Sequence, residues 1–239
     1  MPPFQIRPCT LADGPSLARN NMSAFWTDPN WILLWPKHIT LDFLIEQAAK
    51  RLPNNLLRDR DALRHEVVVD PATGALLGYA RWELPAAKTT TSGPDGGGSR
   101  PEWAAAQIPD VSAEERKALK ERADGAWWEP IDMEGIDDES VKVKERILAE
   151  KPHLSLDYLA VHPKNKGKGI GTALVESGIR QAEKMGIDIF ILAFQAGLNL
   201  YLRLGFKEVE RVVQDDSKWG GKGEYTVYLL TYEVKKSSS

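Results

Sequence analysis

The stretch that says most about this chain is His162-Pro163-Lys164-Asn165-Lys166-Gly167-Lys168-Gly169-Ile170-Gly171-Thr172, which lies between a predicted strand and a predicted helix. Three glycines in five residues let successive backbone N–H groups turn toward one point at a helix start, and such a point binds phosphate. The interleaved lysines add positive charge beside the same helix end. The alternative is a glycine-rich packing turn with ordinary surface lysines.

Two common nucleotide motifs do not fit this loop. A Walker loop places four residues between its first glycine and a Gly-Lys-Ser/Thr ending, and no such run occurs in the chain. A dinucleotide fingerprint that starts at Gly167 requires glycine at position 172, where the chain has Thr172. The loop therefore points to a phosphate-bearing ligand of another kind.

The elements around the loop predict a parallel crossover. Residues 154–161 (LSLDYLAV) form an apolar strand, and residues 171–184 carry an apolar stripe at helical spacing that ends at Gly186. Residues 187–194 are almost continuously apolar, which is typical of a strand buried on both faces. Strand, helix and strand at this spacing form a right-handed parallel unit.

The rest of the chain supplies further strands and helices. Thr10 and Asp13 resemble a capping box before a first helix, and Thr40 begins a second helix that we expect Pro53 to end. The remaining predicted elements are strands at 4–7, 65–70, 76–84, 209–213 and 225–234 and a short helix at 198–204. Together they predict a single α/β domain over residues 1–239, with a mixed sheet of about seven strands and helices on both faces.

Residues 85–152 look like an insertion into this order. Residues 88–101 (KTTTSGPDGGGSRP) contain few apolar side chains and predict a flexible loop, and two helices follow, one opened by Ser112 and Glu115. Between Asp95 and Lys151 there are 15 acidic and 9 basic residues, a net charge of −6. We expect this insertion, with Trp127 and Trp128, to be a lid over an acceptor.

Two motifs resemble the Gcn5-related N-acetyltransferase (GNAT) superfamily, whose acyl-CoA loop has the pattern Gln/Arg-x-x-Gly-x-Gly/Ala after a strand ending in a Leu-x-Val-x-Pro-like phrase. Here Leu159-Ala160-Val161-His162-Pro163 precedes Lys166-Gly167-Lys168-Gly169-Ile170-Gly171. About thirty residues later, Leu200-Tyr201-Leu202-Arg203-Leu204-Gly205-Phe206 is similar to the second signature of that superfamily. The Gln195-Ala196-Gly197 phrase before it resembles a fungal-type branch.

This resemblance implies an acyl-CoA N-acyltransferase fold that uses acetyl-CoA and no metal. The implied cofactor-binding residues are Leu159, Ala160, Val161, Lys166, Gly167, Lys168, Gly169, Ile170, Gly171 and Thr172. The strand backbone would hold the pantetheine arm, and the loop amides would hold the pyrophosphate. Two departures stand out, since Lys166 replaces the usual Gln or Arg, and Phe194 stands where many members have Asn or Ser.

The resemblance also suggests two catalytic residues. Tyr201 occupies the position of the tyrosine that protonates the leaving thiolate, and the alternative is a core tyrosine. Asp157 is a carboxylate inside an apolar strand, at a position where serotonin N-acetyltransferases carry a histidine that helps deprotonate the amine. We expect a buried side chain there, acting as a base or as a structural ion-pair partner. For each of the four histidines, the leading interpretation is a structural role.

Composition excludes several classes of function. The chain has 239 residues with 31 Lys+Arg, 34 Asp+Glu and a pI of about 5.9, which argues against nucleic acid as a partner. Its apolar runs are far shorter than the roughly 20 residues of a membrane helix. A single cysteine, Cys9, excludes an internal disulfide, and the first residues lack the order of a secretory signal, so we expect a cytoplasmic monomer or homodimer.

The leading hypothesis is an acetyl-CoA-dependent N-acetyltransferase that acts on a small-molecule amine. A protein or peptide N-acetyltransferase is the first alternative, and an open acceptor groove in place of a lidded pocket would favour it. The second alternative is a non-catalytic module that binds acyl-CoA. Residue types at Tyr201 and Asp157 favour an enzyme.

Overall fold

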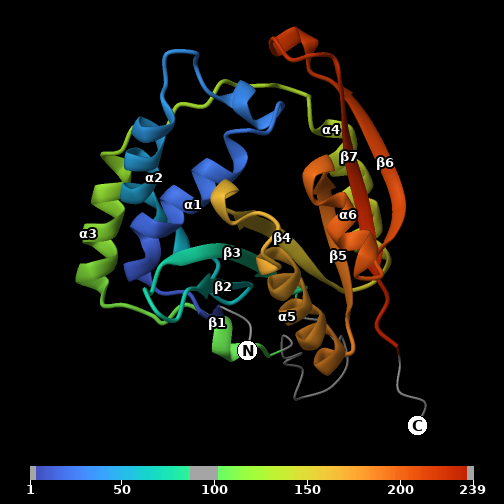
Figure 1. The fold of residues 1–239 in the computed structure, drawn as a ribbon, viewed down its shortest axis with the longest axis horizontal. Helices are drawn as coiled ribbons and strands as arrows, with labels where there is room; N and C mark the ends of the chain where they lie inside the picture. The colour runs from blue at the N-terminus through green and yellow to red at the C-terminus, as the bar shows by residue number, and fades with distance from the viewer. Residues whose placement is uncertain (1–3, 87–101, 236–239) are drawn as a thin grey trace, which may run out of the picture.

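The protein folds around a seven-stranded mixed sheet with helices on both sides (Figure 1). The computed structural model describes residues 4–86 and 102–235. The strands are β1 (Gln5–Pro8), β2 (Leu63–Val69), β3 (Leu76–Glu83), β4 (His153–Val161), β5 (Asp188–Phe194), β6 (Lys207–Asp215) and β7 (Glu224–Tyr232), in the order β1-β2-β3-β4-β5-β7-β6. The α-helices are α1 (Gly14–Phe25), α2 (Leu41–Leu56), α3 (Ala113–Asp124), α4 (Asp138–Glu150), α5 (Ile170–Met185) and α6 (Gln195–Arg203).

Side chains along β2 show how the sheet divides two apolar layers. Val67 and Val69 pack with Leu17 of α1 and Leu56 of α2 on one face. Val68 packs in the cluster that contains Leu174 and Val175 of α5, on the other face. Successive strand side chains point to opposite faces, so this alternation requires α1 and α2 to cover one face and α5 the other. The predicted fold class and the predicted strands are confirmed.

The parallel pair β4–β5 separates part-way along its length. The two strands pair from His153↔Asp188 to Leu156↔Ile191 and no further. Beyond that point β4 keeps its pairing with β3 as far as Val161, and β5 keeps its pairing with β7 as far as Phe194. The two strands therefore diverge, and a V-shaped opening forms between their carboxyl-terminal ends.

A register shift in β4 lies at the same point. Arg81 of β3 pairs with Tyr158, whereas the next residue, Trp82, pairs with Leu156. Asp157 is thus the extra residue of a β-bulge, where a strand bends and twists more strongly. The bulge and the end of the β4–β5 pairing together start the opening.

The prediction that Pro53 ends the second helix was wrong. α2 continues through Pro53 and ends at Leu56. Proline in the last turn removes only one of the final helical hydrogen bonds, and its ring gains packing against α1. A Cβ atom on Gly14 would lie only 2.8 Å from Cγ of Pro53, so glycine at position 14 lets the two helices approach.

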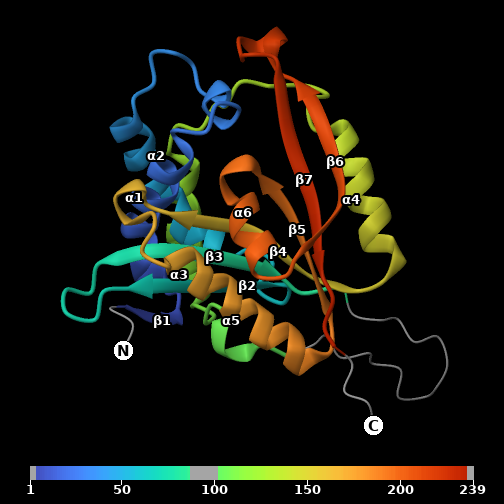
Figure 2. The same cartoon turned by 45° about the vertical axis from the view of Figure 1, so that its right-hand side comes forward.

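The insertion places one helix on each side of the sheet's opening. α3 packs against α2, and Val143 and Ile147 of α4 pack with Val212 of β6. Residues 126–137 run between these two helices and attach to both halves of the fold (Figure 2). Their bonds include Trp127 N to Gln47 Oε1 (3.1 Å), Ile131 N to Leu34 O (2.7 Å) and Gln214 Nε2 to Ile136 O (2.6 Å). The expected flexible loop at 88–101 lies outside the described residues, and the lid remains a prediction.

Within residues 4–86 and 102–235, none of the helices has the length and apolar character required to cross a membrane.

Candidate active site

A cavity of about 1260 Å³ occupies the opening between β4 and β5. Ten of the twelve predicted site residues line it, and they come from β4, the glycine loop, the start of α5, and α6. They are Asp157, Leu159, Val161, Lys166, Gly167, Gly169, Ile170, Gly171, Thr172 and Tyr201. Ala160 and Lys168 do not line it. The side chain of Ala160 is buried in the core, and Lys168 Nζ donates to Asn165 Oδ1 at 2.9 Å.

The glycine loop ends as the N-terminus of α5. Gly167 and Gly169 have φ values of +78° and +80°, a region that residues with a Cβ atom rarely adopt, and Gly169 is the N-cap of α5. Nothing lies within 4 Å of a Cβ built on either glycine, so the backbone conformation alone requires glycine here. The first N–H groups of α5 have no acceptor within the helix and carry its positive dipole end. An anionic group at this end of the cavity would find these donors.

Asn20, which the sequence analysis missed, joins α1 to the end of β4. Its Nδ2 atom donates to Ala160 O at 3.1 Å, and its Oδ1 atom accepts from His162 N at 3.0 Å. Asn20 is only 2% exposed; its bond to Ala160 O is buried and its bond from His162 N is partly buried. The backbone of Ala160 is therefore held by α1 at the start of the glycine loop.

Tyr201 presents its ring to the cavity from α6. The residue is buried, and its ring packs against Phe206 with a centroid distance of 5.8 Å. Burial raises the pKa of the hydroxyl, which therefore keeps its proton at neutral pH. A Cβ on Gly197 would lie 2.8 Å from Cε2 of Tyr201, so glycine one turn earlier makes room for the ring. The protonated hydroxyl can act as a donor or as an acid.

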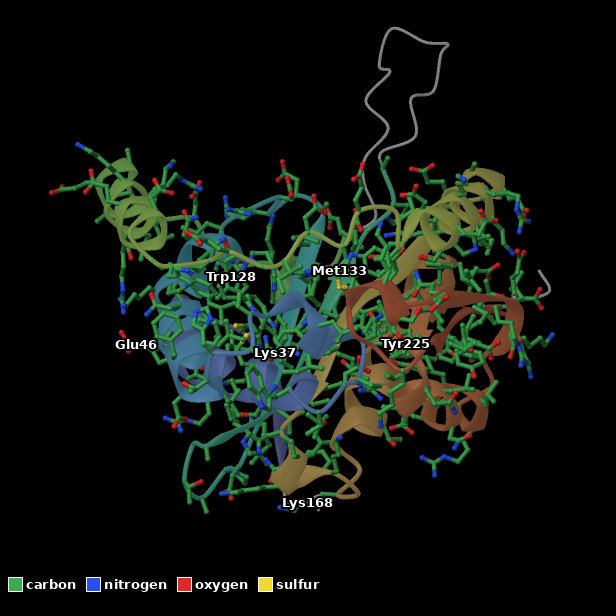
Figure 3. All side chains as sticks on the ribbon, turned by 90° about the horizontal axis from the view of Figure 1, so that it is seen from above. Lys37, Glu46, Trp128, Met133, Lys168 and Tyr225 are labelled. Carbon is green, nitrogen blue, oxygen red and sulfur yellow. The ribbon has the colours of Figure 1, made fainter. Side chains whose placement is uncertain are left out.

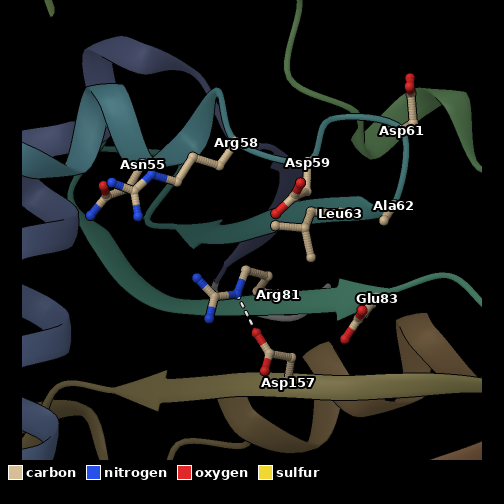
Figure 4. A pocket seen from close by; sticks show the side chains of 9 residues that line it. All are labelled: Asn55, Arg58, Asp59, Asp61, Ala62, Leu63, Arg81, Glu83 and Asp157. Carbon is tan, nitrogen blue, oxygen red and sulfur yellow. Dashed lines mark hydrogen bonds and ion pairs between the residues drawn. The ribbon is translucent and has the colours of Figure 1, made fainter. Parts of the chain in front are cut away.

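Asp157 is exposed, and the expectation of a buried carboxylate was wrong. The strand is apolar on both sides of it, but the bulge turns this side chain out toward the opening. Arg81 Nε donates to Asp157 Oδ2 at 2.5 Å, and both side chains are about one-third exposed, at 33% and 31% (Figure 4). Asp157 also borders a second, polar cavity of about 650 Å³ that contains Arg58 and Glu83. The carboxylate thus separates the main cavity from a second cavity.

Aromatic side chains gather in one part of the cavity lining, the aromatic end. Phe25 and Trp31 come from the end of α1 and the segment after it, Tyr158 from β4, Phe194 from β5 and Tyr225 from β7. Asp28 Oδ2 accepts a hydrogen bond from the hydroxyl of Tyr225 at 3.0 Å, which joins the segment after α1 to β7. In Figure 3, Lys168 lies at the outer edge of the molecule, away from Tyr225. The sequence analysis did not predict that these aromatic residues meet at one site.

The four histidines do not supply an evident base. His65 Nδ1 shares a 2.8 Å hydrogen bond with the hydroxyl of Tyr79, and burial lowers the pKa of His65 to about 3. His153 is buried beside Phe190, and His162 Nδ1 accepts from Lys164 N at 3.2 Å. His38 does not line the main cavity. These placements fit the structural roles that we expected.

Comparison with protein families gives the reaction class of this region. Residues 136–208 match the family model described as an acetyltransferase (GNAT) domain. This segment is similar to GNAT acetyltransferase domains. The match covers α4, β4, the glycine loop, α5, β5 and α6, which together carry the predicted site residues. This match confirms the prediction of an acyltransferase. No curated protein sequence matches the chain significantly.

Solved structures share the fold of this chain over nearly its whole length. One is a histone acetyltransferase HPA2 and related acetyltransferase from Corynebacterium glutamicum, at 19% identity and a TM-score of 0.58, with 99% of each chain covered. Another is a putative arylalkylamine N-acetyltransferase 7 from Aedes aegypti, at 13% identity and 0.58, with 97% of this chain and 88% of that chain covered. A mosquito arylalkylamine N-acetyltransferase like 5b has 13% identity and a TM-score of 0.51, with 96% and 99% covered.

Proposed function

We propose that the protein transfers an acetyl group from acetyl-CoA directly to the amine of a small molecule. The observation that carries this proposal is one continuous cavity with two chemically different ends. The glycine loop and the α5 N-terminus offer anion donors at one end, and aromatic rings and Asp28 line the other. Tyr201 and Asp157 belong to the lining of the same cavity.

The residues around the glycine loop fit a CoA ester. Backbone amides of residues 167–172 would hold its pyrophosphate, since they lie at a helix N-terminus with open space before them. Leu159 and Val161 of β4 border the opening where β5 no longer pairs, which is a place for an extended pantetheine arm. Acetyl-CoA supplies the activated acetyl group as a thioester.

Tyr201 and Asp157 would handle the two protons of the reaction. The attacking amine must lose a proton as its nitrogen–carbon bond forms, and Asp157 receives that proton or passes it to water in the adjoining polar cavity. The departing sulfur needs a proton as the carbon–sulfur bond breaks, and the buried hydroxyl of Tyr201 keeps one to give. Arg81 positions Asp157 through its hydrogen bond.

A small acceptor fits the aromatic end of the cavity better than a protein segment does. The Asp28–Tyr225 hydrogen bond joins the two walls of the opening, and the aromatic side chains crowd the space behind it. Two of the structures with this fold are described as arylalkylamine N-acetyltransferases, and an aromatic-walled cavity suits an acceptor of that kind. A fungal-type branch remains a prediction from the Gln195-Ala196-Gly197 phrase, and a cytoplasmic location remains a prediction from composition.

An acceptor screen that detects free thiol tests this function. The purified protein is incubated with acetyl-CoA and panels of arylalkylamines, alkylamines and peptides, and the released CoA is measured. We expect release with small amines and little with peptides. Release with peptides alone would favour a protein N-acetyltransferase. A thermal shift with acetyl-CoA but no release with any amine or peptide would favour a non-catalytic acyl-CoA-binding module.

A further inference from the structure

A row of aromatic rings crosses the aromatic end of the cavity. Tyr158 packs on Phe25 at a centroid distance of 4.9 Å, Phe25 packs on Phe194 at 6.4 Å, and Phe194 packs on Tyr225 at 5.8 Å. All four side chains line the cavity. Ring faces of this kind attract both apolar groups and cations. The row therefore offers a binding surface for an elongated acceptor.

Each end of this row carries a carboxylate. Asp157 precedes Tyr158 on the bulge of β4, and Asp28 accepts from the hydroxyl of Tyr225. Phe194, the last residue of β5, pairs with Val227 of β7. Tyr225 comes two residues before Val227 in the antiparallel β7 and therefore lies beyond the end of β5. The Asp28 carboxylate therefore marks the end of the cavity that is remote from the β4–β5 separation point.

Asp28 is fixed in place but has no cationic partner among the described residues. Its Oδ1 atom accepts from the N–H groups of Asn30 and Trp31, at 3.0 and 2.9 Å, and Oδ2 accepts from Tyr225. Burial and the nearby Asp28 raise the pKa of the Tyr225 hydroxyl, so it remains a donor. Among the described residues, no Lys, Arg or His forms an ion pair with Asp28. Its negative charge is left for a ligand.

The other charges of this end do not cancel that of Asp28. Glu224 adds a second carboxylate next to Tyr225, and the lining also contains Lys144 of α4. Lys144 makes no ion pair with either carboxylate within the described part of the chain. Asp157, by contrast, is already paired with Arg81. Net negative charge therefore remains at the aromatic end.

We infer that the acceptor is a diamine, or an amine with a second cationic group, whose remote positive charge binds between Asp28 and the rings of Trp31 and Tyr225. The inference rests on the proposed acetyltransferase function and names its substrate class. The reacting amine lies near Asp157, the apolar spacer lies along Phe25 and Phe194, and the second cation reaches Asp28. A charge-assisted hydrogen bond and a ring face together select such a cation over an uncharged end.

The test compares straight-chain α,ω-diamines of increasing length with the monoamines of the same lengths. Free thiol release from acetyl-CoA gives kcat/KM for each compound. We expect one diamine length to exceed its matched monoamine by about 10- to 100-fold, since the remote contact is a hydrogen bond to a charged group. Asp28→Asn should remove this preference, because kcat/KM should fall far more for the diamine than for the matched monoamine. Asparagine keeps an oxygen for the N–H groups of Asn30 and Trp31, so the segment after α1 stays in place.

Two controls keep the outcome clear. Asp42→Asn removes one exposed carboxylate from the first turn of α2, away from the cavity, and should leave the diamine preference unchanged. A thermal shift by the diamine in the presence of CoA measures binding without turnover and should be lost in Asp28→Asn.

The possible failures are distinguishable. Turnover of monoamines with no diamine preference, or equal losses for both compounds in Asp28→Asn, would overturn the cation site and leave the acetyltransferase function standing. An Asp28-dependent thermal shift without thiol release would overturn the proposed function and keep the cation site. Absence of both turnover and shift would overturn the cation site.

Discussion

The side-chain amide of Asn20 on α1 donates to the carbonyl of Ala160 on β4 at a distance of 3.1 Å. The same side chain accepts from His162 N, so one buried residue of α1 holds the backbone on both sides of Val161. This part of β4 no longer pairs with β5. Asn20 therefore fixes one wall of the opening at the point where the glycine loop begins.

Replacing Asn20 by alanine should weaken both the fold and acetyl-CoA binding. Two backbone groups near Val161 would lose their buried partners, which costs about 1–3 kcal/mol for each unsatisfied group. Urea denaturation should show a loss of about 2–4 kcal/mol, and KM for acetyl-CoA should rise. Asn54→Ala on α2, a residue that lines none of the cavities described above, serves as the matched control. Unchanged stability in Asn20→Ala would show that these bonds contribute little.

Gly169→Val should abolish stabilisation by acetyl-CoA. Gly169 has a φ of +80°, which valine does not adopt without strain, so the loop amides would turn away from their common point. Wild-type protein should gain about 2.7 kcal/mol at a hundredfold excess of ligand over Kd, seen as a rise in Tm. Asparagine tolerates positive φ, and Gly169→Asn should keep much of the shift. An undiminished shift in Gly169→Val would place the ligand elsewhere.

Tyr201→Phe should lower kcat by roughly 10- to 100-fold with little change in acetyl-CoA affinity, if the hydroxyl protonates the departing sulfur. Gly197→Ala offers an independent probe, because its Cβ would lie 2.8 Å from Cε2 of Tyr201 and would displace the ring. Steady-state kinetics and a binding titration separate these effects. Wild-type kcat in Tyr201→Phe would return Tyr201 to a packing role against Phe206.

Asp157→Asn should reduce kcat/KM by about tenfold or more, because the amine would lose its proton acceptor. The ion pair with Arg81 is one-third exposed, so its loss should change the free energy of unfolding by no more than about 1 kcal/mol. Arg81→Gln removes the partner and keeps the carboxylate. If Asp157 only pairs with Arg81, the two variants should have equal kcat/KM. A much larger loss in Asp157→Asn indicates direct action on the amine.

The glycine loop and its flanking elements could be predicted because the information is local. The β4–α5–β5 unit lies within residues 153–194, and the residues that end its helix and shape its loop are adjacent in the chain. Positive φ at Gly167 and Gly169 is the conformation that glycine spacing suggested. These are the features where residue type fixes backbone conformation directly.

Contacts between distant segments could not be predicted in the same way. Asn20 and Ala160 are 140 residues apart, and Asp28 and Tyr225 are 197 residues apart, so no local pattern connects them. The exposure of Asp157 was missed because apolar neighbours suggest a buried strand, whereas the bulge and the end of β5 pairing depend on other strands. The aromatic end of the cavity likewise requires four separate elements to meet.

Glu66 on β2 makes the stability of the fold depend on pH. The side chain is 8% exposed, Ser177 Oγ donates to Oε1 at 2.9 Å, and Oε2 lacks a hydrogen-bond partner within the described residues. Burial raises the pKa of this carboxyl to about 7, and the Ser177 bond and Arg180 oppose the rise only in part. The group therefore favours the folded state when protonated and opposes it when ionised.

The pKa of Glu66 is higher in the folded state than in the unfolded state. Its stabilising contribution to the free energy of unfolding is therefore fully present below the unfolded pKa of 4.5 and is lost as the pH rises through about 7. The loss approaches about 3 kcal/mol, since one pKa unit corresponds to about 1.4 kcal/mol. Glu66→Gln stays neutral, so its free energy of unfolding relative to wild type should rise between acid and mildly alkaline pH. Glu176→Gln, exposed on the same helix as Ser177, should show a small effect in both conditions. Chemical denaturation across this range measures the difference. A constant gap between Glu66→Gln and wild type would mean that folding does not raise the pKa of Glu66.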